Sequence, residues 1–242
     1  MSAFVSIVHP YACHLFTDQA VWNGADQTLI DIRSKVTVSA NRVAVITQGD
    51  AELGSEVSGE ICARADALGP ASVLTDLQSY ADALRERLGD IEPPRGLHVL
   101  VTGMLPVLGG AHRHFFTYTA RDRRAYQVIN PDASVYWAGS RFKAEDIEKF
   151  GLGRRPTEND AAFNRRLGLD ILNIMRFRAG RSQENGPLDI WCVGGNIDLT
   201  TIFASRAIVE THECWNDQIG EKIDPFRGMS RAERRRIERL VA

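Results

Sequence analysis

Several common signatures are missing from this sequence of 242 residues. Its 29 Lys and Arg against 31 Asp and Glu give a net charge of −2, so it lacks the charge excess of a nucleic-acid binder or an acidic tail. The longest stretch without a charged residue or histidine, 99–111, has 13 residues, whereas a transmembrane helix needs about 20. The four cysteines are far apart and form no C-x-x-C pair, which argues against a zinc ribbon and a dense disulfide scaffold.

The composition that remains is that of a globular protein, with 44% hydrophobic and 25% charged residues. The chain begins with no basic segment ahead of its first apolar residues and no small-residue cleavage pattern, so we expect no secretory signal, no membrane association and a cytoplasmic location. Walker, dinucleotide-glycine, G-x-S-x-G and H-E-x-x-H motifs are absent. We therefore expect no cofactor and no metal ion.

Apolar periodicity and turn residues predict an alternation of strands and helices. The predicted strands are 4–8, 13–17, 35–38, 42–47, 97–102, 112–119, 126–129, 190–193, 197–204 and 207–213, and the predicted helices are 53–68, 77–88, 143–150, 157–178 and one after 230. Antiparallel hairpins separated by helices predict an α+β fold, a four-layer αββα sandwich of two antiparallel sheets flanked by helices. Residues 1–215 form one predicted domain, and 216–242 a C-terminal extension with an arginine-rich helix.

Two capping boxes are predicted from hydroxyl residues followed three positions later by Glu or Gln. Thr75 with Gln78 would begin the helix 77–88, and Ser230 with Glu233 would begin the arginine-rich helix. The apolar edge of that last helix is expected to pack on the body or on a neighbouring subunit. The nearly balanced charge of the chain argues against nucleic-acid binding.

Ser2 is the most informative residue for chemistry. It follows Met1 and precedes Ala3, and a small second residue allows removal of the initiator methionine, so the mature chain would begin with a free serine. The α-amine of such a residue, with a pKa of about 8, can take the proton of its own hydroxyl. An N-terminal nucleophile also benefits from a nearby ammonium, from a carboxylate that orients the ammonium, and from a backbone N–H that stabilises the oxyanion.

Candidates for these three groups lie at the ends of the first predicted strands. Asp18 ends the second strand, Lys35 opens the third and Gly49 follows the fourth. Their spacing and context resemble the N-terminal-nucleophile (Ntn) hydrolases of the proteasome β-subunit type, including the bacterial relatives HslV and Anbu. Asp18 lies 16 positions after Ser2, and Gly49 lies 14 after Lys35, which matches the family; the 33 positions from Ser2 to Lys35 imply one inserted residue. The resemblance implies that Ser2 is the nucleophile, Asp18 and Lys35 its polar partners, and Gly49 the oxyanion donor.

Two further segments resemble the family, and one departs from it. Residues 136–140, Tyr-Trp-Ala-Gly-Ser, are similar to its Gly-Ser segment, which implies that Ser140 supports the nucleophile; a helix N-cap is the alternative role for this serine. Residues 192–199 are similar to its glycine-initiated strand. The usual Asp and Ser after the second pair of helices have no clear match in 181–186.

The resemblance implies a hydrolase that cleaves peptide or other amide bonds through an ester at Ser2, and a homo-oligomer, with a ring as one arrangement. The alternative is a non-catalytic structural or assembly subunit of the same fold. In that case Asp18 would be a turn residue, Lys35 a solvated strand end paired with Asp31, and Gly49 a position that needs a positive φ.

Two histidine pairs in the sequence have spacings that metal sites also use. His112 and His114 would share one strand face, as would His212 and Cys214. A partly exposed strand face is the more common explanation for such spacing, so neither pair is assigned a metal.

Overall fold

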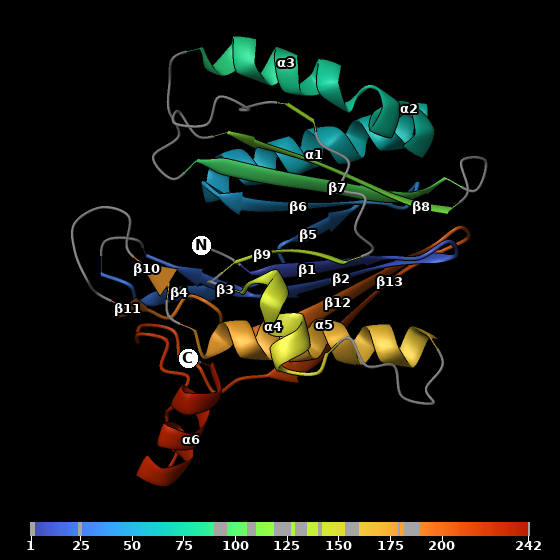
Figure 1. The fold of residues 1–242 in the computed structure, drawn as a ribbon. Coiled ribbons are helices and arrows are strands. Elements are labelled where there is room, and N and C mark those ends of the chain that lie inside the picture. Colours follow the sequence, from blue (N-terminus) through green and yellow to red (C-terminus); the bar gives the residue numbers. More distant parts are fainter. Residues whose placement is uncertain are drawn as a thin grey trace.

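The structure, a computed structural model, describes residues 3–23, 26–89, 96–105, 110–118, 127–128, 135–139, 142–152, 160–178, 180–181 and 189–241. It is an α+β protein built from antiparallel sheets and helices, which confirms the predicted class. From top to bottom in Figure 1 the layers follow one another as helices, sheet, sheet and helices. This order is compatible with the predicted four-layer sandwich.

The first sheet has five strands in the order β13-β12-β2-β1-β9, and each neighbouring pair is antiparallel. The hairpin predicted from the first two strands is confirmed, whereas β9, which pairs with β1, was not predicted. The strands of this sheet are β1 (Phe4–Val8), β2 (Ala12–Asp18), β9 (Val135–Ala138), β12 (Asn196–Phe203) and β13 (Ala207–Cys214).

The second sheet has four strands in the order β5-β6-β7-β8, again antiparallel. They are β5 (Val36–Val38), β6 (Val43–Gly49), β7 (Leu97–Leu105) and β8 (Gly110–Tyr118). A hairpin that was not predicted, β3 (Ala20–Trp22) and β4 (Leu29–Ile32), connects β2 of the first sheet to β5 of the second. A further short pair is formed by β10 (Gly180–Arg181) and β11 (Asp189–Ile190). Of the predicted strand 126–129, residues 127 and 128 are not in a strand and the others lie outside the described residues.

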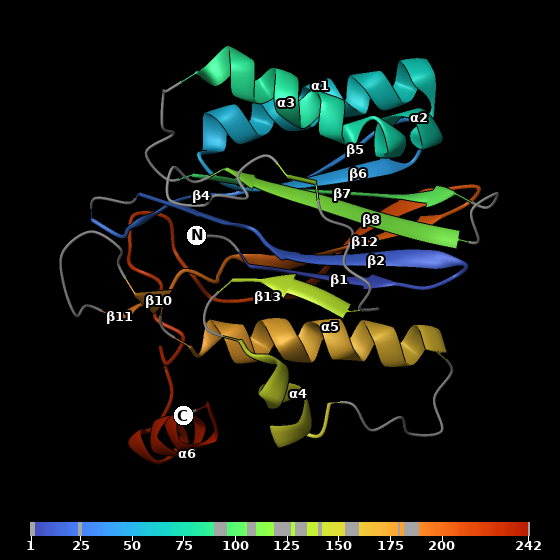
Figure 2. The ribbon, with the colours of Figure 1, turned by 45° about the horizontal axis from the view of Figure 1, so that its top comes forward.

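Helices α1 (Ala51–Leu68), α2 (Pro70–Thr75) and α3 (Leu77–Leu88) cover the outer face of the second sheet, and α5 (Asp160–Arg176) covers the first, with the short α4 (Ala144–Lys149) beside it (Figure 2). Helix α2 was not predicted, and it overturns the predicted Thr75 capping box. Thr75 ends α2, where its hydroxyl donates to the Ala71 carbonyl at 2.9 Å, and Asp76 is the residue that precedes α3.

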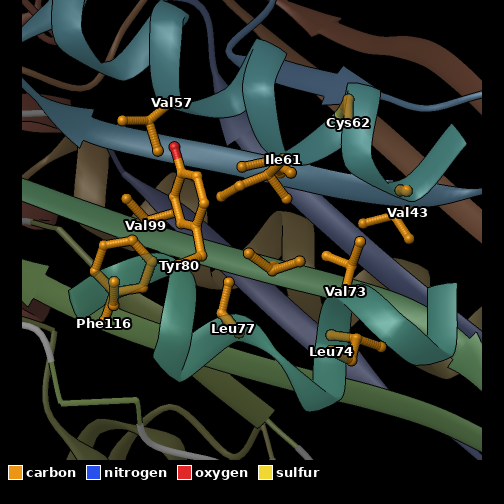
Figure 3. Close-up of a cluster of buried hydrophobic side chains, with 14 of the residues drawn as sticks. Val43, Val57, Ile61, Cys62, Val73, Leu74, Leu77, Tyr80, Val99 and Phe116 are labelled. Carbon is orange, nitrogen blue, oxygen red and sulfur yellow. The ribbon is translucent and has the colours of Figure 1, made fainter. Parts of the chain in front are cut away.

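Apolar side chains fill the three spaces between these layers. Under α1 and α3, Ile61 and Leu77 pack with Val99 and Phe116 of the second sheet (Figure 3). Strand β2 contributes side chains both to the space between the sheets and to the space under α5, because successive side chains of a strand point to opposite faces. Leu15 therefore packs between the sheets and Phe16 packs under α5, each with no exposed surface.

The contact between α5 and β2 leaves no room for a side chain at Gly168. A Cβ there would lie 2.2 Å from the ring of Phe16, which is fully buried, whereas a Cβ at Gly59 of α1 would meet nothing within 4 Å. We expect Gly168→Ala to lower the free energy of unfolding by about 1–3 kcal/mol through overpacking, and Gly59→Ala to raise it by up to about 1 kcal/mol because alanine favours the helix. Urea denaturation measures both, and equal shifts of the same sign would contradict this packing.

Burial of His14 in β2 makes stability depend on pH. Desolvation, with smaller effects of His9 and Arg165, lowers the pKa of His14 from 6.5 to about 4, so the unfolded chain binds a proton more readily than the folded one. Stability is therefore lost as the pH falls from 6.5 towards 4, by about 2–3 kcal/mol for this group. We expect His14→Gln to remove that part of the slope in denaturant unfolding measured at several pH values; a parallel slope in parent and variant would contradict it.

The C-terminal helix α6 (Arg231–Val241) lies beyond α5, on the side away from α1–α3 (Figures 1 and 2). The capping box at its start is confirmed, because the Ser230 hydroxyl and N–H donate to the Glu233 carboxylate and the Glu233 N–H donates back to the Ser230 hydroxyl. None of the described α6 side chains is buried. In contrast, Ile223 and Phe226 of the predicted extension are buried against the body. The boundary at residue 215 stays a prediction. None of the described helices is long and apolar enough to cross a membrane.

Candidate active site

The chain immediately after Ser2 is fixed beside Asp18. The N–H of Ala3 donates to Asp18 Oδ1 at 2.7 Å, and the N–H of Asp18 donates to the Ala3 carbonyl at 3.2 Å. Both residues are fully buried. Ser2 itself lies outside the described residues, but the peptide that follows it is held against the carboxylate predicted to be its partner.

Asp18 and Lys35 form a buried ion pair. Lys35 Nζ lies 2.9 Å from Asp18 Oδ2, and the exposed fractions of the two side chains are 9% and 0%. The alternative of Lys35 as a solvated partner of Asp31 is wrong, because Lys35 is nearly buried and pairs with Asp18. Asp31 instead lies 3.6 Å from Arg33. The alternative of Asp18 as a turn residue is wrong as well, since it is the buried last residue of β2. The contact between Asp18 and Lys35 that the resemblance implied is therefore present in the fold.

The Lys35 ammonium has donor capacity left over. Although it lies at ion-pair distance from Asp18, it makes no hydrogen bond of good geometry with any described residue. A buried donor that is left unsatisfied costs free energy. Its N–H groups are thus available to a further acceptor, which a substrate or a neighbouring hydroxyl can supply.

A pocket of about 240 Å³ opens beside this ammonium. Its wall combines the β3 strand, the segment before β5, the two sheet strands β5 and β6, and the first turns of α1. The lining residues are Ala20, Val21, Trp22, Arg33, Ser34, Lys35, Thr37, Thr47, Gly49, Asp50, Ala51, Ser55 and Ser58. Two of the predicted site residues, Lys35 and Gly49, therefore share one pocket.

Gly49 ends β6 with a φ of +118°, a conformation that L side chains rarely adopt. A Cβ at this position would lie 2.2 Å from the carbonyl oxygen of Gly96. The next residue, Asp50, begins α1 by accepting the N–H groups of Glu52 and Leu53 at 3.1 and 3.0 Å. The backbone thus requires glycine here, as the structural alternative predicts; the oxyanion role of its N–H stays a prediction.

Ser140 lies outside the described residues, but Gly139 before it is described. Strand β9 pairs with β1, with Ala138 opposite Phe4. Gly139 has a φ of +142°, and a Cβ on it would lie 2.8 Å from that of Ala3. The segment that leads to Ser140 therefore passes directly against the residue that follows Ser2.

The loop 193–195 is a part of the site that sequence reasoning did not assign to it. The Gly194 N–H donates to Asp18 Oδ2 at 3.4 Å, and its carbonyl accepts the Ala20 N–H at 3.0 Å. Ala20 also donates weakly to Asp18 Oδ2, at 3.3 Å. Burial raises the pKa of the adjacent Cys192 thiol, to which Asp18 and Lys35 make smaller, opposed contributions. The pair Gly194-Gly195 indicated the start of the strand that follows it. Its position in the sequence did not indicate a contact with Asp18.

The histidine pair of β8 lies elsewhere. His112 and His114 line a separate pocket of about 400 Å³ together with residues of α2, α3 and β7. Burial, and then the neighbouring His112, lowers the pKa of His114. Among the residues that the structure describes, no three His, Cys, Asp or Glu side chains come close enough to hold a metal ion. In the second pair, His212 and Cys214, the side chain of Cys214 lies outside the described residues.

The fold thus brings Ala3, Asp18, Lys35 and Gly194 together at one end of the first sheet, and Gly49 lines the same pocket as Lys35. A buried, oriented ammonium beside a hydroxyl can lower the pKa of that hydroxyl and stabilise an alkoxide. No protein-family model and no curated protein sequence matches the chain.

Proposed function

We propose that the chain is an N-terminal-nucleophile hydrolase. Within that class we propose the proteasome β-subunit type, related to HslV and Anbu, which cleaves peptide or other amide bonds through Ser2 once Met1 is removed. The observation that carries the proposal is the buried Asp18–Lys35 pair at 2.9 Å, on the same carboxylate that holds the N–H of Ala3. The order of layers, with a helix directly after Gly49, supports the same assignment.

In the proposed mechanism the free α-amine of Ser2 takes the proton of the Ser2 hydroxyl. Lys35, held by Asp18, stabilises the developing alkoxide, which attacks the carbonyl carbon of the substrate. The Gly49 N–H donates to the resulting oxyanion. The α-ammonium then protonates the leaving amine, an ester remains on Ser2, and a water molecule activated by the same α-amine hydrolyses it.

The pocket beside Lys35 would receive the substrate side chain next to the cleaved bond. Its wall offers hydroxyl groups from Thr37, Thr47 and Ser55, an indole from Trp22, and the half-exposed Arg33. Ser140, which follows the Gly139 that contacts Ala3, would support the nucleophile. We further propose a homo-oligomer, for which a ring is one arrangement.

A covalent inhibitor tests this proposal. A peptide β-lactone or epoxyketone is expected to form one adduct per chain, on Ser2, and a matched fluorogenic peptide is expected to be hydrolysed until that adduct is complete. If a saturating concentration of the inhibitor forms no adduct on a chain from which Met1 has been removed, the proposal is wrong.

That outcome would favour the second candidate, a non-catalytic assembly subunit of the same fold. The observation that favours it is the lack of a clear match to the Asp and Ser of the family in 181–186. Hydrolysis that depends on Lys35 would exclude this candidate.

A further inference from the structure

We infer that Asp217, in the segment after the last strand, positions the carboxylate of Asp18 by holding the loop 193–195 together with Arg176. The inference rests on the proposed function, in which Asp18 orients Lys35. It assigns a role to a residue of the predicted C-terminal extension, a part of the chain that the mechanism above does not use.

Arg176 and Asp217 form a two-pronged ion pair inside the protein. Arg176 Nη1 and Nη2 donate to the two oxygens of Asp217 at 2.8 and 2.9 Å, and the exposed fractions of the side chains are 6% and 4%. The ring of Trp215 covers the guanidinium, 4.5 Å from its carbon. A buried pair with this bidentate geometry has one defined arrangement, because both charges are desolvated and each is satisfied by the other.

The pair holds the loop from one side. Arg176 Nη1 donates to the Val193 carbonyl at 2.9 Å, and the Gly195 N–H donates to Asp217 Oδ2 at 2.9 Å. The Trp215 N–H donates to the Gly195 carbonyl, also at 2.9 Å. The residues on both sides of Gly194 are thus fixed by the end of α5 and by the segment 215–217.

The same loop touches Asp18 from its other side. Gly194 donates its N–H to Asp18 Oδ2 at 3.4 Å, and Ala20 donates to the Gly194 carbonyl at 3.0 Å. This N–H and the Lys35 ammonium meet on the same oxygen, Oδ2. The position of Gly194 therefore influences the orientation of the Asp18 carboxylate relative to the Lys35 ammonium.

The contact of the loop 193–195 with Asp217 leaves its backbone little room to move. A Cβ on Gly194 would lie 2.7 Å from Asp217 Oδ2 and 2.9 Å from Ile223 Cδ1, and Gly195 has a φ of +77°. Because the backbone of the loop is pressed directly against the carboxylate of Asp217, loss of that carboxylate opens space beside Gly194. Movement of the loop into this space would withdraw the N–H from Asp18.

A second ion pair at the end of α5 provides a matched control. Arg178 Nη2 donates to Asp146 Oδ1 at 2.7 Å, and the side chains are 10% and 7% exposed. Like Asp217, Asp146 also accepts a backbone N–H, that of Lys143, at 2.6 Å. The Asp146 carboxylate joins α4 to Arg178, two residues after α5, whereas Asp217 joins the last residue of α5 to the loop at Asp18.

The experiment compares Asp217→Ala with Asp146→Ala in the full-length chain. The probe is a peptide β-lactone, for which the maximal rate of adduct formation at Ser2 and the reversible affinity are measured separately. We expect both variants to melt at a similarly lowered temperature. We expect only Asp217→Ala to reduce the maximal labelling rate, by about tenfold or more, with an affinity within twofold of the parent and faster hydrogen exchange in 193–195. The isosteric Asp217→Asn serves the same comparison if the alanine variant does not fold.

Three results would overturn the inference. The labelling rate of the folded Asp217 variant could equal that of the parent, the Asp146 variant could lose as much rate at equal loss of stability, or the exchange of 193–195 could be unchanged. Absence of labelling in the parent chain would instead refute the proposed function, and the inference with it, so the two failures are distinguishable.

Discussion

Ser2→Ala is expected to abolish covalent labelling and amide hydrolysis, with a loss of more than about 1,000-fold. The variant removes the only atom that forms the ester in the proposed mechanism. Alanine also allows removal of Met1, so the α-amine is still present and only the hydroxyl differs. Labelling by a peptide β-lactone, followed by intact mass, measures the effect directly.

Two further variants control for this result. Ser2→Thr keeps the hydroxyl and adds a methyl that restricts its rotamers, so we expect it to retain labelling. Ser205→Ala removes an exposed hydroxyl from the turn between β12 and β13, outside this pocket, and should leave the rate within about twofold of the parent. Labelling of Ser2→Ala at the rate of the parent would show that another residue is the nucleophile.

Lys35→Met is expected to lower the labelling rate by more than about 100-fold, because the ammonium that stabilises the Ser2 alkoxide is lost. It is also expected to lower the free energy of unfolding by about 3–5 kcal/mol, since Asp18 would remain buried without its cation. The rate is measured on the folded fraction, whose size is given by circular dichroism.

Neighbouring substitutions separate catalysis from stability. Lys35→Arg keeps the charge but presents a planar group that does not reproduce the ammonium, so we expect it to recover stability more than rate. Arg33→Ala removes a second cation of the same pocket, with a side chain 57% exposed, and is expected to change stability by less than about 0.5 kcal/mol. Full activity in folded Lys35→Met would contradict the role assigned to this lysine.

The strands and helices with a regular apolar period were predictable from the sequence. In α5 the pattern reflects burial of one helix face. Strand β2, which is buried on both faces, was found from its run of apolar residues after a turn. The missed elements are short. Strand β3 has three residues and β4 has four, which is too few to establish a period. Helix α2 was missed because Gly69-Pro70 indicates a helix end, whereas Pro70 is in fact the first residue of the next helix.

The candidate site divides in the same way. Asp18 and Lys35 lie at the ends of two predicted strands, and their resemblance to a known catalytic set implied a contact that the structure contains. Arg176, Asp217 and the loop 193–195 meet only because α5, β12 and the C-terminal segment converge on the end of the first sheet. Side-chain contacts between such distant positions depend on the packed fold and have no local signal in the sequence.

The mass of the mature chain tests the central claim most directly. The proposed chemistry needs a free α-amine on Ser2, so the account predicts that intact-mass and N-terminal peptide measurements of the purified protein find a chain that begins at Ser2, and one adduct on that residue after treatment with the β-lactone. A chain that retains Met1 would contradict the account, because a serine blocked by methionine has no amine to act as the base.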